Sequence, residues 1–203
     1  MPKATDTILE LDLNALDNNY KYIISKISPA TKLLAVVKAF AYGSDSVAIA
    51  KELETLNVDY FAVAYTTEGV ALRDAQIKTP ILVLHPVPAN FEETVNRCLE
   101  PSIYSKKILK EFIAVAESKN QIDYPIHLKF DTGLNRLGFE INEIPFIAEM
   151  LSKTNSVKVK SAFSHLAASE DLSEKDFSVG QINSFRKISE QLISQIGYKP
   201  LLH

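Results

Sequence analysis

Lys38 combines a chemically useful side chain with a position at the end of a predicted β-strand. It follows the apolar residues 33–37 and precedes Tyr42-Gly43 and Ser44-Asp45, a pair typical of a helix start. A lysine that is partly withdrawn from water can act as a nucleophile or a base, and a phosphate can settle at a helix N-terminus beside a phenol hydroxyl. The spacing alone leaves open that Lys38 is an ordinary solvated lysine.

Two further stretches carry candidate residues. Residues 127–139 (HLKFDTGLNRLGF) hold two cations, Lys129 and Arg136, in a polar loop whose two glycines permit unusual backbone angles. A plainer interpretation is that Asp131 pairs with Arg136 and only holds the loop. His165 follows the apolar residues 158–164, where a structural role and a functional one are equally open.

The elements that position these residues alternate along the chain. Strand-sized apolar runs cover residues 33–38, 60–64, 80–84, 101–104, 125–130, 158–164 and 200–203. Amphipathic stripes between them predict helices at residues 16–27, 49–56, 91–99, 108–115 and 182–196. We expect helix caps at Asp45 and Ser105 and a helix end at Gly197.

This order of strand, helix and strand indicates an α/β fold with a parallel sheet. No Gly-rich dinucleotide fingerprint follows the first strand, and seven strands on one pattern favour a (β/α)8 TIM-type barrel over an open doubly wound sheet. Residues 8–13 alternate strictly, which predicts a half-buried strand outside the barrel. We therefore expect residues 1–14 to belong to a missing C-terminal β-domain and residues 15–203 to form an incomplete barrel, truncated before its last strand.

Composition excludes several classes of protein. The net charge of −3 gives no footprint for nucleic acid or an anionic membrane, and no run of residues is long and apolar enough to span a bilayer. A single cysteine, Cys98, excludes an internal disulfide, and the first residues do not resemble a signal peptide. We expect a cytoplasmic protein without a metal site.

Three motifs resemble those of the alanine racemase family. Residues 36–43 (VVKAFAYG) are similar to its pyridoxal-phosphate attachment motif V-K-A-N-A-Y-G-H-G, with Phe40 in place of Asn and Ser44-Asp45 in place of His-Gly. The Phe form resembles racemases of the Bacteroidetes type. Residues 127–138 resemble H-x-K-x-D-T-G-M-x-R-L-G, and residues 163–167 (FSHLA) match the stretch that carries the family's ring-stacking histidine.

The resemblance implies roles for particular side chains. Lys38 would bind pyridoxal 5'-phosphate and serve as one of two bases, and Tyr42 and Leu84 would line the cofactor site. Arg136 would donate to the phenolic oxygen of the cofactor near the substrate carboxylate. His165 would stack on the pyridine ring, and Lys129 would be a candidate for carbamylation, while His85 and His127 are expected to be structural.

The same resemblance implies an activity and its limits. The parent protein would be a homodimer that interconverts L- and D-alanine and supplies D-alanine for peptidoglycan. In the family the opposite base is a tyrosine of the partner's C-terminal domain, so we expect these 203 residues alone to be inactive or nearly so. The alternatives are a serine racemase and a non-catalytic barrel that binds pyridoxal phosphate, either a cofactor-homeostasis protein or a scaffold.

Overall fold

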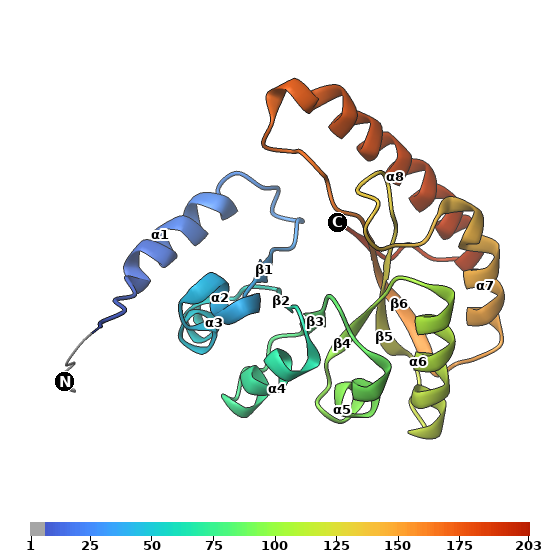
Figure 1. The fold of residues 1–203 in the computed structure, drawn as a ribbon, viewed down its shortest axis with the longest axis horizontal. Coiled ribbons are helices and arrows are strands. Elements are labelled where there is room, and N and C mark those ends of the chain that lie inside the picture. The colour runs from blue at the N-terminus through green and yellow to red at the C-terminus, as the bar shows by residue number, and fades with distance from the viewer. Residues whose placement is uncertain (1–6) are drawn as a thin grey trace. The chain divides into compact units, whose positions relative to one another are not determined.

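A computed structural model describes residues 7–203 of the chain, in which parallel strands alternate with helices (Figure 1). The chain divides into two compact units. Unit 1 holds the residues up to His85 together with Arg97–Leu99, and unit 2 holds Pro86–Asn96 and Glu100–His203.

Unit 1 is built on three parallel strands, β1 (Leu34–Val36), β2 (Tyr60–Val63) and β3 (Ile81–Val83). Its helices are α1 (Leu13–Ile24), α2 (Lys38–Gly43), α3 (Ser46–Thr55) and α4 (Thr66–Asp74). The strands are short and mostly apolar; β2 and β3 are buried along their whole length, as expected for strands covered on both faces, whereas β1 is partly exposed. Phe61, Val63 and Ile81 are fully buried and form the centre of the core of this unit.

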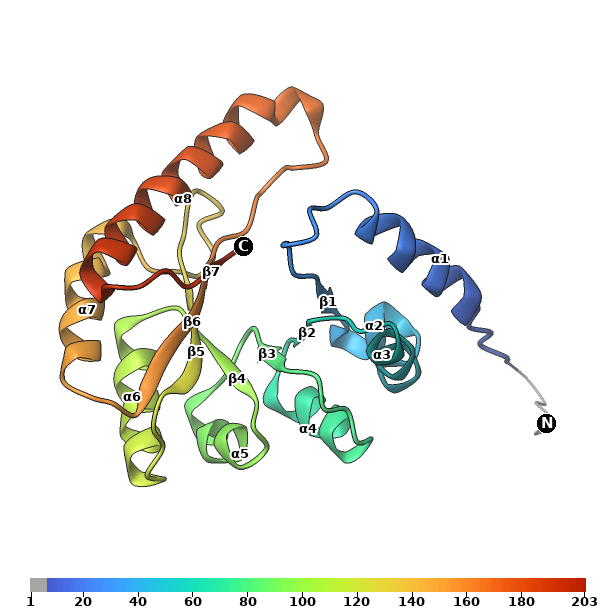
Figure 2. The ribbon, with the colours of Figure 1, turned by 180° about the vertical axis from the view of Figure 1, so that it is seen from behind.

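Unit 2 contains four parallel strands, β4 (Glu100–Ile103), β5 (Tyr124–Lys129), β6 (Val157–Phe163) and β7 (Leu201–Leu202). Its helices are η1 (Pro88–Asn90), α5 (Phe91–Asn96), α6 (Lys106–Ser118), η2 (Ile141–Glu143), α7 (Ile144–Ser152), η3 (Leu172–Glu174) and α8 (Lys175–Ile196). The longer helices α6, α7 and α8 cover one face of the strands, as the view from behind also shows (Figure 2).

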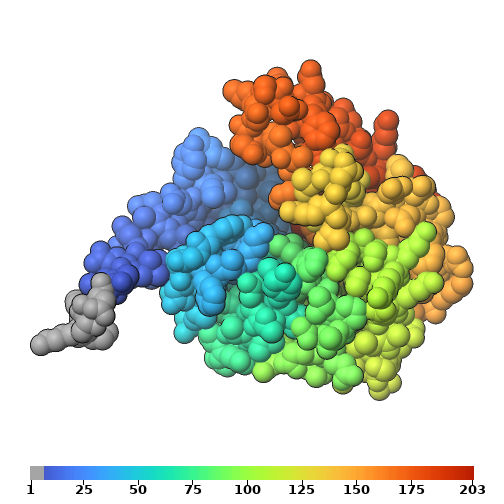
Figure 3. Space-filling model, viewed as in Figure 1, coloured from blue at the N-terminus to red at the C-terminus, as the bar shows by residue number. Residues whose placement is uncertain are grey.

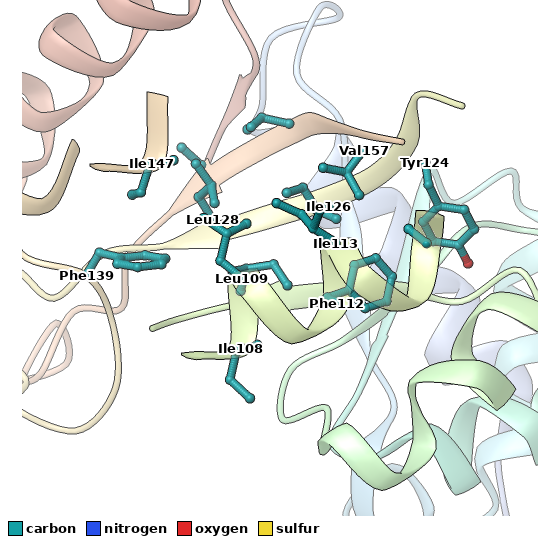
Figure 4. Close-up of a cluster of buried hydrophobic side chains, with 14 of the residues drawn as sticks. Ile108, Leu109, Phe112, Ile113, Tyr124, Ile126, Leu128, Phe139, Ile147 and Val157 are labelled. Atoms are coloured by element: carbon teal, nitrogen blue, oxygen red, sulfur yellow. The ribbon is translucent and has the colours of Figure 1, made fainter. Parts of the chain in front are cut away.

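The two faces of these four strands differ in chemistry. Ile126, Leu128 and Val157 point toward the helices and join the apolar core with Phe112 and Ile147 (Figure 4). A register shift between Ile126 and His127 interrupts the pairing of β5 with β6. Beyond it, polar side chains lie on the opposite face, and this face carries the candidate residues of unit 2.

The predicted elements match the observed ones closely. Asp45 and Ser105 cap α3 and α6 through bonds to backbone amides, and α8 ends at Gly197, which adopts the left-handed conformation at φ 79°. The strand predicted at residues 8–13 is not formed: α1 begins at Leu13, where the Asp12 carboxylate caps its first turn. A lone strand leaves its backbone groups unpaired, so the assignment of residues 1–14 to a β-domain stays a prediction, and residues 1–6 lie outside the described part.

Candidate active site

Lys38 stands directly after β1, where the chain leaves the sheet. The preceding residue, Val37, is buried and donates its backbone N–H to the Ala62 carbonyl at 2.9 Å, which extends the pairing with β2. The Lys38 side chain is half-buried. The sheet thus fixes the backbone on one side of the lysine and leaves its amine reachable.

The turn that follows is left-handed. Ala39, Phe40, Ala41 and Tyr42 have φ between 51° and 61°, and none of them is a glycine. Such a turn still places residues four apart on one side, and the Lys38 ammonium lies 5.9 Å from the centre of the Tyr42 ring. The Tyr42 side chain is 70% exposed. The structure therefore brings these two predicted residues together.

The start of α3 is not free to hold a phosphate, contrary to the expectation from sequence. The Asp45 carboxylate accepts hydrogen bonds from the Val47 and Ala48 amides at 2.9 and 3.0 Å. These are the donors that an anion would need, and a negative charge already occupies them. Any phosphate near Lys38 must find its donors elsewhere, and the Tyr42 hydroxyl is one such group.

Leu84 follows β3 in the same way that Lys38 follows β1. Its backbone N–H donates to the Val63 carbonyl at 2.9 Å, and its side chain is half-buried. The neighbouring His85 meets the Tyr65 ring edge-on, with ring centres 5.7 Å apart. This packing agrees with the structural role predicted for His85.

In unit 2, Lys129 closes β5 and is buried, with only 8% of the residue exposed. Its ammonium lies 5.9 Å from the centre of the Phe163 ring. Burying a cation is costly unless neighbouring groups compensate its charge, and a ring face supplies part of that compensation.

Asp131 organises the loop after β5 through the backbone. One carboxylate oxygen accepts from the Gly133 and Asn135 amides at 2.9 and 3.1 Å. Arg136 is exposed, and within residues 7–203 it forms no ion pair with Asp131. The plain interpretation of an Asp131–Arg136 pair is therefore wrong, because the carboxylate is already engaged. The loop lies at the surface of unit 2 (yellow in Figure 3).

Gly138 lets the end of this loop return to the strand. Its φ is 145°, and a Cβ there would lie 2.4 Å from the Asp131 nitrogen and 2.6 Å from the Phe130 carbonyl carbon. The close approach permits Phe139 N–H to donate to the Lys129 carbonyl and Asp131 N–H to donate to the Phe139 carbonyl. The loop is thereby closed at the lysine that it follows.

His165 is exposed just after β6, and a glutamine in α8 holds its segment. Gln181 is 2% exposed and donates to the Thr132 hydroxyl and the His165 carbonyl, both at 3.2 Å, while its own carbonyl accepts from Ala167 N–H at 2.9 Å. The sequence analysis did not single out Gln181, which directly precedes the helix predicted at residues 182–196. The presence of a glutamine on the buried side of a helix could have indicated that it holds the segment of His165.

A chain of hydrogen bonds crosses the polar face of unit 2. The Glu100 carboxylate meets His127 Nε2 at 2.7 Å, His127 Nδ1 meets the Ser161 hydroxyl at 2.6 Å, and that hydroxyl meets His203 Nε2 at 3.0 Å. Although His203 as a residue is exposed, its ring stacks on Phe163, with centres 4.8 Å apart. Burial of the ring, and secondarily the charge of His127, lower the pKa of His203 to about 4. His127 is thus a buried structural residue, as predicted.

Comparison with known proteins identifies the family of this chain. Residues 11–203 match the family described as alanine racemase, N-terminal domain. The chain is 33% identical over 201 residues to an alanine racemase of Citrifermentans bemidjiense, covering 96% of this chain and 52% of that protein. It is 35% identical over 191 residues to one of Fusobacterium nucleatum, covering 92% and 51%.

Solved structures agree. An alanine racemase of Bacillus anthracis with bound L-Ala-P matches with a TM-score of 0.89 at 28% identity, over 100% of this chain and 52% of that one. One of Clostridium difficile 630 in complex with cycloserine matches with a TM-score of 0.87 at 30% identity, over 94% and 52%. The expected α/β fold is thereby confirmed, and the chain spans about half the length of the relatives that it matches. None of the helices in residues 7–203 has the length and apolar character of a membrane span.

Proposed function

Because the chain belongs to the alanine racemase N-terminal domain family, we propose that it carries the cofactor lysine of a pyridoxal-phosphate enzyme that interconverts L- and D-alanine. The observation that carries this proposal is the position of Lys38 after β1, where its ammonium lies 5.9 Å from the centre of the exposed Tyr42 ring. Both residues lie within the family match over residues 11–203. The enzyme would work in the cytoplasm and supply D-alanine for peptidoglycan.

The residues around Lys38 fit covalent attachment of an aldehyde cofactor. The amine is reachable, and within residues 7–203 it forms no ion pair that would have to be broken first. The Tyr42 hydroxyl would donate to the phosphate, which the start of α3 cannot hold, and Leu84 would contribute apolar lining. When bound, pyridoxal phosphate withdraws electrons from the substrate Cα and so weakens its C–H bond.

Racemisation requires that a proton leave one face of Cα and that another arrive on the opposite face. Lys38 Nζ would hold and return the proton on one face, because a side chain positioned within reach of Cα can act as the base there. The opposite base is a tyrosine of a second subunit in a homodimer, from the half of the relatives that this chain does not span. We therefore expect residues 1–203 alone to bind cofactor weakly and to racemise little or no alanine.

Arg136 and His165 orient the substrate and the cofactor. The exposed Arg136 guanidinium would donate to the phenolic oxygen of the cofactor near the substrate carboxylate, and His165 would pack against the pyridine ring, as the family resemblance implies. Carbamylation of Lys129 would turn a buried cation into an anion that fixes Arg136. Mass spectrometry of the intact chain in bicarbonate, with Lys129→Arg as the control, would detect or exclude the added carbamate.

The deciding experiment is to mix the protein with pyridoxal phosphate, record its visible spectrum, reduce it with borohydride and map the labelled peptide. We expect the label on Lys38, its loss in Lys38→Ala, and no change in Lys51→Ala, which removes an exposed lysine of α3. A label spread evenly over surface lysines would overturn the assignment of Lys38.

A further inference from the structure

Glu68, near the start of α4, joins two segments of unit 1 through backbone amides. Its Oε1 accepts from Ala39 N–H at 2.9 Å, and Ala39 directly follows the candidate lysine. Its Oε2 accepts from Ala64 N–H at 2.6 Å and from Tyr65 N–H at 3.3 Å, where β2 passes into α4. One half-buried carboxylate therefore joins the start of its own helix to Ala39, which lies 29 positions earlier in the sequence.

The segment that Glu68 contacts is strained. The left-handed conformation is unfavourable for any residue with a Cβ, and four such residues follow Lys38 in succession. A strained stretch of this kind persists only where its surroundings determine it. Bonds from Ala41 N–H to the Val37 carbonyl and from Ser44 N–H to the Phe40 carbonyl close the turn upon itself. The bond from Ala39 to Glu68 instead joins its first residue to another element.

Capping of α4 accounts for the two hydrogen bonds to Oε2 but not for the bond to Oε1. A glutamate at the third position of a helix commonly accepts from the amide before the helix, as Oε2 does here. Glu143 does the same, accepting from Glu140 N–H at 2.9 Å, but its other oxygen faces the Lys106 ammonium at 3.4 Å. The Oε1 bond to Ala39 is therefore additional to the cap, and Glu143 is a matched control for it.

We propose that Glu68 is a positioning residue for Lys38, which keeps the left-handed turn in place and thereby directs the lysine amine. The proposal rests on the proposed function only in taking Lys38 as the residue that binds the cofactor. Glu68 also lines a cavity of about 240 Å³ with Val37, Phe40 and Thr67, so its carboxylate borders the space beside the turn.

Glu68→Gln tests this with almost no change in shape. An amide offers one oxygen acceptor and one NH2 donor, so it cannot accept at both ends. The amide oxygen should take the place of Oε2, where two N–H groups donate, so the bond that is lost is the one from Ala39. We expect hydrogen exchange of the Ala39 backbone amide, measured by NMR without cofactor, to become faster by about tenfold or more. This is the change expected when one hydrogen bond to a charged acceptor is lost. Glu143→Gln should leave Ala39 exchange unchanged.

The second readout is the rate at which Lys38 is trapped by pyridoxal phosphate and borohydride. We expect a fall of about tenfold in Glu68→Gln and none in Glu143→Gln. If Lys38 of the unaltered protein is labelled but Glu68→Gln is labelled equally fast, the inference is overturned. If the unaltered protein labels no single lysine, the proposed function fails, while Ala39 exchange still decides whether Glu68 holds the turn.

A second variant covers the case in which Glu68→Gln does not fold. Replacing Ala39 with its α-hydroxy acid by nonsense suppression removes only the donor N–H and leaves the α4 cap intact. Slower trapping at Lys38 in this variant, with an unchanged circular dichroism spectrum, supports the inference. An unchanged trapping rate overturns it.

Discussion

Lys38, which follows β1, and Lys129, which ends β5, are both followed by backbone with positive φ, but the residues that adopt it differ. After Lys38 these are alanines and aromatic residues, held by bonds to Val37, Ser44 and Glu68. In the loop after Lys129 the two largest positive φ values belong to Gly133 and Gly138. The positive φ of the first stretch is imposed by surrounding contacts, whereas that of the second stretch is permitted by its glycines. Exchanging glycine and alanine should therefore have opposite effects in the two stretches.

The largest effect is expected for Gly138→Ala. Its Cβ would lie 2.4 Å from a backbone nitrogen, which cannot move as the end of a side chain can, so we expect a loss of roughly 4 kcal/mol in the free energy of unfolding. Gly180→Ala is the control, because a Cβ in that turn of α8 meets nothing within 4 Å, and it should stabilise by up to about 1 kcal/mol. Urea unfolding measures both. Equal stability of the two variants would show that the loop does not need its glycine.

Gln181→Leu should come next. It removes the three hydrogen bonds of a buried amide and leaves Ala167 N–H without its acceptor, which should cost about 2–3 kcal/mol. The exposed Asn183 of the same helix provides a comparison, since Asn183→Ala should change stability by less than about 0.5 kcal/mol. Faster amide exchange at Ala167 in the Gln181 variant alone would locate the effect. Unchanged exchange there would mean that the segment of His165 is held by other contacts.

Ala39→Gly tests the other stretch. Ala39 is exposed at φ 52°, so glycine removes left-handed strain without loss of packing, and we expect stabilisation of about 0.5–1 kcal/mol. The same replacement at Ala114, exposed in the right-handed helix α6, should destabilise by about 1 kcal/mol. Thermal unfolding of both variants measures the difference in sign. Destabilisation by both would show that residue 39 does not carry strain.

The remaining prediction concerns the pH dependence of stability and involves unit 2 alone. The pKa of His203 falls from 6.5 to about 4 on folding, so the folded chain binds fewer protons between these values. Stability from this group is present above pH 6.5 and is lost as pH falls toward 4. His203→Gln should flatten the rise of the unfolding midpoint between pH 4.5 and 6.5. An NMR titration of His203 in the ordinary range near 6.5 would contradict the expectation.

Much of this arrangement could be predicted from the sequence, because local patterns carry it. Capping residues and apolar runs located the strands and most helices. Within the described residues three α-helices were not predicted: α2, which is left-handed, α4, which is short and contains Gly69, and α7, which is apolar on most of its sides. The residues predicted for catalysis all follow strands as expected, and their chemical roles stay predictions.

The contacts that hold those residues could not be predicted in the same way. Ala-Phe-Ala-Tyr contains no glycine or asparagine, so nothing in residues 39–42 indicates a left-handed turn, and alanine favours the opposite hand. The helix start at α3 suggested an anion site, but Asp45 serves it as a cap. Glu68 and Gln181 resemble ordinary helix residues until their partners, 29 and 16 positions away, are known.

The bond from Ala39 to Glu68 also sets an order of events as the chain is made. A nascent chain that has emerged only as far as α3 contains the lysine but neither β2 nor the carboxylate that fixes the turn. Until both have left the ribosome, residues 39–42 have no reason to adopt the left-handed form. Selective reaction of Lys38 with an aldehyde would then mark the moment at which this part of the molecule has folded.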